Sequence, residues 1–216
     1  MSKPFKTFSQ ADVAAMDRIP RLKFINSISG FKSANLVGTR GSMGENLAIF
    51  SSVIHLGSNP AWLGMILRPA TVPRHTWEHI QETGCYTINH ITESMIQQAH
   101  AVSAAYGPEV SEFEIANLTP VYRKDFPAPF VSESPVGIGL ELVETHEIGN
   151  GCKLIVGAAK WIFVEEGMFE PDHFVDLAEG NVVAIGGLDG YYQPRKLARF
   201  DYARPGQPIE EIKHED

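Results

Sequence analysis

The chain has 216 residues, of which 44% are hydrophobic, so it can bury the core of a single domain. Its formal net charge of −8 excludes an overall electrostatic attraction to nucleic acid. Because Cys85 and Cys152 form neither a CxxC motif nor a disulfide framework, and the N-terminus lacks the apolar segment of a signal peptide, we expect a protein of the reducing cytoplasm.

The first element predicted along the chain is a short helix. Ser9 is a typical N-cap residue and Asp12 follows three residues later, so a helix is expected to run to about Asp17. Segments with the composition of β-strands come next, at about 22–28, 33–40, 46–55, 61–68 and 85–91.

A long uncharged stretch runs from Asn46 to Leu67 and has the length of a membrane span. The sequence Gly57-Ser58-Asn59-Pro60 within it is a turn signal, because a proline biases the preceding residue away from helix. The stretch is therefore predicted to form two strands joined by a turn, and no membrane interaction is expected.

Helices are predicted between and after these strands. One is expected from Pro73 to Thr83, where Gly84 stops it, and a short one from Ser111 to Leu118. A longer helix is expected after Thr92 as its cap, running through Tyr106 to a stop at Gly107-Pro108.

The C-terminal half returns to strand patterns, at 136–145 and 152–165 with IGNG as the turn between them, and at 181–185 before Gly186-Gly187. The polar tail after Arg204 is expected to be loosely ordered. Clustered strands with a few inserted helices predict a mainly β fold, a β-barrel with helical cover, and not alternating βαβ units.

The segment His75-Thr76-Trp77-Glu78-His79 matches the HxxEH pattern of one class of zinc proteases. A catalytic zinc needs a third protein ligand, and the sequence supplies no diagnostic one. We therefore predict no metal site, although a zinc hydrolase using His75, Glu78 and His79 remains an alternative. The other interpretation is that these are ordinary polar residues of a short helix.

Two further features, a glycine-rich segment and the two cysteines, give weaker indications of function. AIGGLDG, at 184–190, follows an apolar strand but lacks the GxGxxG spacing of a dinucleotide loop, so a tight turn is predicted beside Tyr191 and Tyr192. These tyrosines are either core aromatics or contacts to a ligand. Cys85 and Cys152 lie in strand-like segments, where a buried, inert thiol is the usual case.

Arg68, at a strand end, and Arg74 and Thr76, at a helix start, form a set suited to one phosphate group. A helix N-terminus offers unpaired N–H groups to an anion, and arginines add charge-assisted hydrogen bonds. The alternative is two solvated arginines and a helix cap, and composition alone favours it.

The order of motifs resembles the flavin reductase-like, FMN-binding split-barrel family. The likeness spans about residues 30–195 and consists of NLVGTRGSMGENLAIFSSVIHLGSNPAWLGMILRP, RHTWEHIQETGCYTINHIT, AVSAAYGPEVSEFEIANLTP, SESPVGIGLELVETHEIGNGCKLIVGAAKWIFVEEG and AIGGLDGYY. The resemblance implies one FMN-binding split-barrel domain over residues 1–216, with 1–29 as an extension and 196–216 as a tail.

The resemblance also implies non-covalent FMN near the interface of a homodimer, with its ring beside the uncharged strand and its phosphate beside the arginines. One departure is Ile49, which stands where many members have proline. The implied cofactor-binding residues are Ile49, Phe50, Ser51, Ser52, Arg68, Arg74, His75, Thr76 and Asn89.

The implied activity is reduction of a flavin or another small-molecule substrate, with NADH or NADPH as electron donor and hydride transfer through bound FMN. Because the cofactor carries this chemistry, no side chain is assigned as a catalytic acid, base or nucleophile. The alternative within the family is a non-catalytic FMN-binding or electron-carrier protein.

Overall fold

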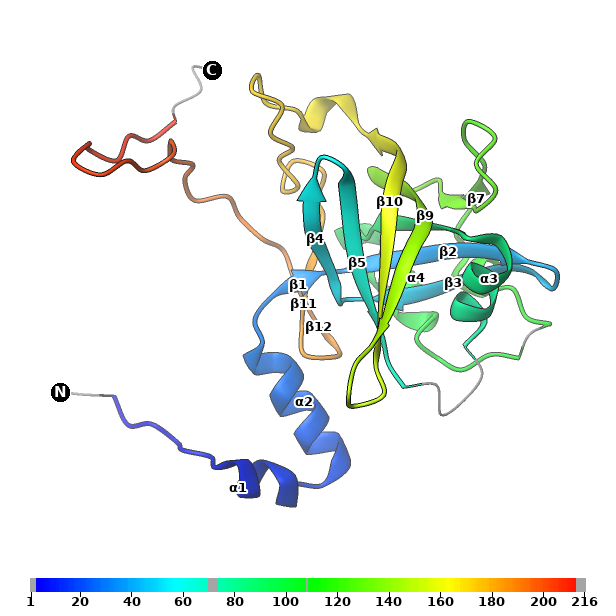
Figure 1. Cartoon of the computed structure of the whole chain (residues 1–216), viewed down its shortest axis with the longest axis horizontal. Coiled ribbons are helices and arrows are strands. Elements are labelled where there is room, and N and C mark those ends of the chain that lie inside the picture. The colour runs from blue at the N-terminus through cyan, green and yellow to red at the C-terminus, as the bar shows by residue number, and fades with distance from the viewer. Residues whose placement is uncertain (1–2, 70–73, 108, 213–216) are drawn as a thin grey trace.

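A computed structural model describes residues 3–69, 74–107 and 109–212 of the chain. The chain is mainly β, with antiparallel sheets and a few short helices around them (Figure 1). This confirms the predicted fold class. None of the helices in the described ranges is long and apolar enough to cross a membrane.

The main sheet has seven strands. They are β2 (Asn35–Gly41), β3 (Gly44–Phe50), β4 (Val53–Ser58), β5 (Ala61–Leu67), β6 (Cys85–His90), β9 (Val136–Glu147) and β10 (Lys153–Val164). Their order is β3-β2-β6-β9-β10-β5-β4, and all neighbours are antiparallel. The two edge strands, β3 and β4, are consecutive in the sequence, so the edges of the sheet meet where one ends and the other begins.

The uncharged stretch from Asn46 to Leu67 forms the junction between the two edge strands. The segment predicted as one strand over 46–55 is in fact two strands, because Ser51 and Ser52 interrupt it. The Ser52 carbonyl accepts a hydrogen bond from the Ile66 backbone N–H (2.9 Å), which fixes the break against β5. The turn predicted at Asn59-Pro60 joins β4 to β5, and the IGNG turn joins β9 to β10 with Gly151 at φ +82°.

Helix α3 (His75–Thr83) confirms the predicted helix, and Gly84 stops it in the left-handed conformation at φ +70°. The expected start at Pro73 lies outside the described residues. Helix α1 (Gln10–Ala15) is also confirmed: the Asp12 N–H donates to Ser9 Oγ (3.1 Å), and the Ser9 N–H donates to Asp12 Oδ2 (2.7 Å).

The strand predicted at 22–28 is wrong, because these residues belong to helix α2 (Arg18–Ile28). Short apolar segments fit either state from periodicity alone. Here the side chains of Asn26 and Ser27 donate to the carbonyls of Leu22 and Lys23 one turn earlier. Proline is tolerated in a first helical turn, which is where Pro20 lies.

The long helix predicted after Thr92 is also wrong in its extent. The structure has a 3₁₀ turn η1 (Glu93–Met95) and helix α4 (Ile96–Ala101), and the Thr92 side chain makes no capping bond. The predicted stop at Pro108 lies outside the described residues. The short helix predicted at 111–118 is confirmed as α5 (Glu112–Ala116), which ends at Asn117 in the left-handed conformation.

Smaller elements complete the fold. The strand predicted at 181–185 begins only at Ala184, where β11 starts, and Gly187 forms the following turn at φ +69°. The elements are β1 (Lys32–Ser33), β11 (Ala184–Gly186) and β12 (Gly190–Tyr192) in one sheet, β7 (Pro120–Val121) and β8 (Phe130–Val131) in another, and the 3₁₀ turn η2 (Glu166–Met168).

The core lies on both faces of the main sheet. Val37 of β2 packs with Met65, Leu140 and Ile155 from other strands of the sheet. Its neighbour Leu36 belongs to a different cluster, together with residues of α4 and α5. Successive strand residues point to opposite faces, so this second cluster holds α4 and α5 against the face of the sheet opposite Val37.

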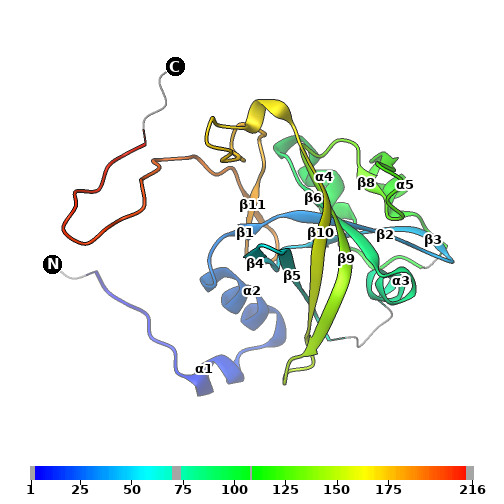
Figure 2. The ribbon, with the colours of Figure 1, turned by 45° about the horizontal axis from the view of Figure 1, so that its top comes forward.

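Both ends of the chain extend away from the barrel. In Figures 1 and 2, helices α1 and α2 and the chain after β12 project on the same side of the sheet. The tail is tied to the 165–180 segment by Lys196 and Arg199, which pair with Glu170, Asp172 and Asp176. Further along, Phe200 forms an isolated bridge with Glu211.

Candidate functional site

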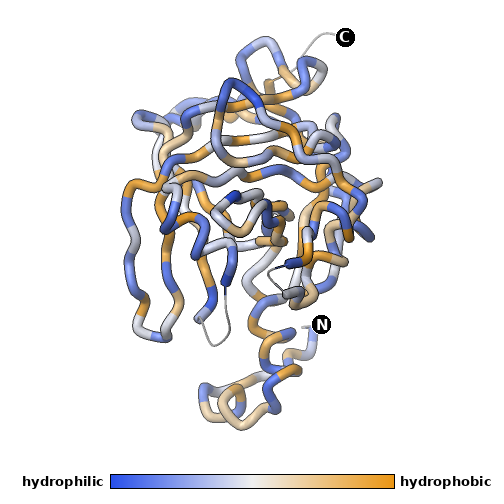
Figure 3. The backbone as a smooth tube through the Cα atoms, turned by 90° about the vertical axis from the view of Figure 1, so that its right-hand side faces the viewer, coloured by the Kyte–Doolittle hydropathy of each residue, from blue (hydrophilic) through white to orange (hydrophobic). Residues whose placement is uncertain are grey.

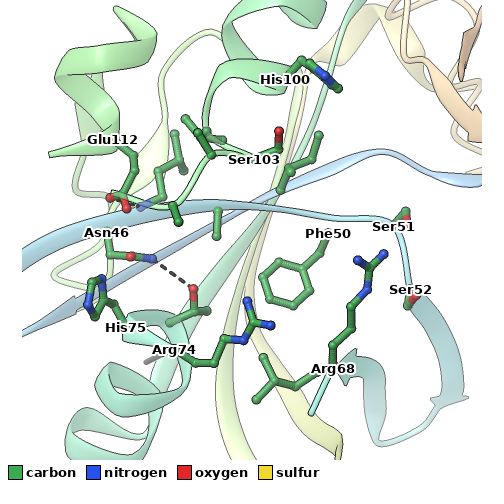
Figure 4. Close-up of a pocket in the computed structure, with 18 of the residues that line it drawn as sticks. Asn46, Phe50, Ser51, Ser52, Arg68, Arg74, His75, His100, Ser103 and Glu112 are labelled. Atoms are coloured by element: carbon green, nitrogen blue, oxygen red, sulfur yellow. Dashed lines mark hydrogen bonds between the residues drawn. The ribbon is translucent and has the colours of Figure 1, made fainter. Parts of the chain in front are cut away.

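A pocket of about 500 Å³ lies where the two edges of the sheet meet. Its lining comes from five parts of the chain (Figure 4): β3 from Asn46 onward, the end of β5 with the start of α3, the end of α4 with the loop after it, Glu112 at the start of α5, and β11 with the turn that follows it. The lining includes Ile49, Phe50, Ser51, Ser52, Arg68, Arg74, His75 and Thr76. The structure thus brings together every predicted cofactor-binding residue except Asn89.

The strand side of the pocket is formed by Asn46 through Ser52. At its end, the Phe50 carbonyl accepts a hydrogen bond from Asn35 Nδ2 (3.2 Å), which holds the strand just before the break. Ser51 and Ser52 lie outside β3 and β4. Their polar groups therefore lie beside apolar side chains in the lining, as a flat ligand with a few hydrogen-bonding atoms requires.

The other side of the pocket is cationic. Arg68 follows β5, and Arg74 occupies the position before the first turn of α3. Figure 4 shows both guanidinium groups pointing into the pocket on either side of the Phe50 ring. Arg74 Nε is buried and has no hydrogen-bond partner among the described residues. A buried unpaired donor on a charged group is costly, so an anion in the pocket would be stabilised here.

The start of α3 adds to this positive potential. The N–H groups of Trp77 and Glu78 donate to the Arg74 carbonyl, which leaves those of His75 and Thr76 at the open end of the helix. Thr76 is buried, with 6% of its surface exposed, and its Oγ1 accepts a hydrogen bond from Asn46 Nδ2 (3.0 Å). Helix dipole, hydroxyl and guanidinium groups together suit a phosphate.

The remaining walls were missed by sequence reasoning. His100 lines the pocket from the last turn of α4, and Ser103 and Ala104 line it from the loop that follows, within the segment predicted as helix through Tyr106. Glu112 lines it from the start of α5. Leu188 and Asp189 line it from the turn after β11. The glycines of AIGGLDG indicated that turn, but nothing in the sequence indicated that it borders the pocket.

Tyr191 and Tyr192, left open by the sequence, are not among the pocket-lining residues. Tyr191 packs against the core and its hydroxyl lies 3.1 Å from Nδ1 of His100, which does line the pocket. Tyr192 is half-exposed and packs edge-on against Phe31.

Asn89 lies outside the pocket and is fully buried in the barrel. Its Nδ2 donates to Thr87 Oγ1 (2.9 Å) and to the Leu36 carbonyl (3.2 Å), and its Oδ1 accepts from the Val131 N–H (3.0 Å). Unlike the other predicted residues, Asn89 is therefore placed in the barrel interior, where its amide holds strands together.

The two histidines of the HxxEH motif lie one turn apart on α3, but their surroundings differ. His75 faces the pocket, whereas His79 is buried and its Nδ1 lies 3.3 Å from Thr39 Oγ1. Burial lowers the pKa of His79 below its ordinary value of 6.5. In the described ranges, no group of three or more His, Cys, Asp or Glu side chains is placed to hold a metal ion.

The two cysteines are unpaired. Cys85 is buried, and its burial raises the pKa of the thiol above its ordinary value. A raised pKa disfavours the reactive thiolate, which supports the inert role expected for Cys85. Cys152 lies in the turn before β10 and is partly exposed.

Comparison with known proteins assigns this chain to a family. The chain matches the flavin reductase like domain over residues 32–185. It therefore belongs to this family of flavin-binding proteins, and the resemblance seen in the sequence is confirmed.

Solved structures identify the fold as the split barrel. A protein of Shewanella frigidimarina NCIMB 400, provisionally assigned as a flavin reductase with a split barrel domain, is 48% identical, with coverage of 92% of this chain and 100% of that one and a TM-score of 0.88. Component B of nitrilotriacetate monooxygenase from Bacillus cereus is 19% identical over 91% and 98% of the two chains, with a TM-score of 0.80. Flavoredoxin of Desulfovibrio vulgaris (Miyazaki F) is 24% identical over 82% and 91%, with a TM-score of 0.67.

Proposed function

We propose that this chain binds FMN non-covalently in the pocket, with the phosphate between Arg68, Arg74 and Thr76 and the ring along Ile49–Ser52. The observation that carries the proposal is the buried Arg74 Nε, which has no partner among the described residues and lies beside the start of α3. A ligand with an anionic end would be stabilised beside this group, because hydrogen bonds between a guanidinium and an anionic acceptor are stronger than neutral ones.

We further propose that the chain is an NAD(P)H-dependent reductase of flavins or other small molecules. The chemistry that FMN supplies when bound is acceptance of a hydride from NADH or NADPH and its onward transfer. The chain's own residues bind and orient: the arginines hold the anionic end, while the end of β3 and the break at Ser51 and Ser52 supply apolar walls and directed hydrogen bonds. No acid or base from a side chain is required.

The test is an absorbance spectrum of the protein reconstituted with FMN, followed by anaerobic addition of NADH or NADPH. Bound flavin that is bleached by either nicotinamide, with steady oxidation of the nicotinamide in air, supports the reductase. Bound flavin that neither nicotinamide reduces favours the alternative of an electron carrier. Absence of bound flavin after reconstitution with excess FMN contradicts both.

We also propose that the chain forms a homodimer. Helices α1 and α2 bury no residue in the single chain, although Ile19, Ile25 and Ile28 of α2 are 52%, 42% and 65% exposed. Figure 3 shows hydrophobic segments in this projecting part. Helices this short gain most of their stability from packing, so a second copy is the expected cover. Light scattering of the FMN-loaded protein should give twice the 23.8 kDa chain mass, and a monomer that binds FMN tightly would contradict the proposal.

We place the protein in the cytoplasm. The support is its two unpaired cysteines, one of them buried, because disulfides are rare in reducing compartments. Cell fractionation tests this, and recovery of the protein outside the cytoplasm would contradict it.

A further inference from the structure

Behind the cationic side of the pocket lies a cluster of four buried polar side chains. Thr39, Asn46, Thr76 and His79 are 0%, 5%, 6% and 3% exposed. Buried polar groups are nearly always hydrogen-bonded, and a connected set of them fixes the orientation of each member.

The cluster is built where a hairpin meets a helix. Thr39 of β2 and Asn46 of β3 are directly paired across the antiparallel strands, so their side chains share one face. Thr76 and His79 are three residues apart on α3, so they share one face of the helix. Helix α3 packs on β2 and β3, which brings the two pairs together.

Asn46 is the link between the pairs. Its Nδ2 donates to Thr76 Oγ1 at 3.0 Å (Figure 4) and more weakly to Thr39 Oγ1 at 3.4 Å. Thr39 Oγ1 in turn lies 3.3 Å from His79 Nδ1. Both protons of the Asn46 amide are therefore engaged, and its nitrogen is held against the Thr76 hydroxyl.

A similar pair elsewhere in the barrel shows what is unusual here. Asn89 Nδ2 donates to Thr87 Oγ1 (2.9 Å), and the Thr87 hydroxyl donates onward to the Pro129 carbonyl (2.6 Å). The Thr76 hydroxyl accepts in the same way from Asn46, but no protein acceptor for its proton is found within residues 3–69, 74–107 and 109–212. Since Thr76 lines the pocket, an acceptor in the pocket would complete the chain.

We propose that Asn46 is a positioning residue that makes the Thr76 hydroxyl a donor to the phosphate of a bound flavin, and so raises the preference of the pocket for FMN over riboflavin. This rests on the FMN binding proposed above. A hydroxyl has one proton, and an amide N–H on its oxygen turns that proton away from Asn46. The hydroxyl is then oriented before the ligand arrives, which reduces the entropy lost on binding.

The experiment is a fluorescence titration of FMN and riboflavin against wild type, Asn46→Ala, Thr76→Val and the double variant. Asn46→Ala should lower the FMN-to-riboflavin affinity ratio about three- to fivefold, the scale of one modest hydrogen bond. In the Thr76→Val background, the same change should have no further effect on the ratio. Asn46→Asp should lower the ratio more than Asn46→Ala, because its carboxylate would accept the Thr76 proton and repel the phosphate.

Asn89→Ala is the matched control, because it removes the same kind of amide-to-hydroxyl bond away from the pocket, and it should leave the ratio unchanged. If Asn46→Ala does not fold, as judged by circular dichroism, Asn46→Leu removes the same donor with a side chain of similar size. Equal losses for both flavins, an unchanged ratio, or an effect that persists in Thr76→Val would overturn the role of Asn46 while leaving FMN binding intact. Failure of wild type to bind FMN would overturn the proposed function itself, and this inference with it.

Discussion

Two asparagine–threonine pairs in this barrel make the same amide-to-hydroxyl hydrogen bond, but the two threonine hydroxyls differ in what they can donate to. In the barrel interior, Asn89 donates to Thr87, and Thr87 donates to a main-chain carbonyl, so the hydrogen bonds close within the protein. Beside the pocket, Asn46 donates to Thr76, and the chain of donors ends at the pocket wall. The closed network is suited to stability, and the open one to a ligand.

The same contrast extends to the charged groups. Arg199 in the tail is paired with Glu170 and Asp172, whereas Arg74 Nε is buried without a partner among the described residues. At the pocket, Arg74 Nε is thus a charged donor without a protein partner, whereas the buried unpaired hydroxyls of Tyr86 and Ser134 elsewhere in the described residues are neutral. Under the proposed function, this charged donor is what would favour a phosphorylated flavin over the flavin ring alone.

The largest expected effect comes from removing the charge at the open end. Arg74→Ala should weaken FMN binding about ten- to hundredfold, the usual scale for hydrogen bonds to charged groups. Riboflavin, which lacks the phosphate, should bind almost as before, and the defect should shrink at high salt because part of it is electrostatic. Fluorescence titration of both flavins measures this.

The control for that variant is Arg40→Ala, since Arg40 is exposed and bonds to the Tyr122 hydroxyl outside the pocket. It should change neither affinity. Equal losses of FMN and riboflavin in Arg74→Ala would show that this arginine supports the ring pocket or the fold instead.

Breaking the closed network around Asn89 should lower the stability of the protein and leave its preference for FMN unchanged. Asn89→Ala leaves the Val131 N–H without its buried acceptor, and such a group costs about 1–3 kcal/mol of unfolding free energy. Chemical denaturation of the apoprotein should show this loss, while the preference for FMN stays at the wild-type level. If Asn89→Ala instead loses the preference for FMN over riboflavin while its stability is unchanged, Asn89 acts in cofactor binding.

Removing the neutral hydroxyl of the open network should have a smaller effect on binding. Thr76→Ala is expected to weaken FMN binding about three- to tenfold, less than Arg74→Ala, because it removes a neutral donor. Riboflavin binding should again hold. A loss of FMN affinity larger than that of Arg74→Ala would mean that the start of α3 contributes more to phosphate binding than the arginine charge does.

The smallest effect concerns pH. Burial, with a smaller contribution from His75, lowers the pKa of His79 below 6.5 against the raising effect of Glu82 and Glu78. The folded state therefore binds fewer protons than the unfolded state once pH falls below 6.5, so stability is full above that pH and declines below it. His79→Gln should flatten this decline in denaturation curves recorded between pH 7 and pH 5, and it should leave flavin reduction largely intact.

A decline of equal slope in His79→Gln would show that other groups carry the pH dependence. His90, whose pKa is lowered to about 4 by burial, is the natural candidate. Stoichiometric zinc lost together with activity in His79→Ala would instead support the hydrolase alternative.

The fold was largely predictable because the barrel strands and α3 have clear local signals, such as Gly84 after the helix. Helix α2 was not, since a short apolar segment fits a strand equally well until its partners are known. The loop after α4 was read as helix because residues 102–106 have helix-forming composition, whereas the chain turns at Ala101 to line the pocket.

The site was predictable where motif order identifies residues, as for Arg74 and Thr76. It was not predictable where tertiary contacts decide which side chains reach the pocket. Asn46 and Asn89 are both strand asparagines, and only the meeting of β3 with α3 gives the first a place at the pocket. The hairpin pairing of Thr39 with Asn46 about Ser42 and Met43 was the one signal in the sequence that could have pointed to it.

The most direct test of the account is the ratio of FMN to riboflavin affinity for the wild-type protein, measured by titration at low and at high salt. If the phosphate binds at the cationic end, FMN should bind about tenfold or more tightly than riboflavin at low salt, and the ratio should fall as salt rises. Equal affinities at both salt concentrations would contradict the account.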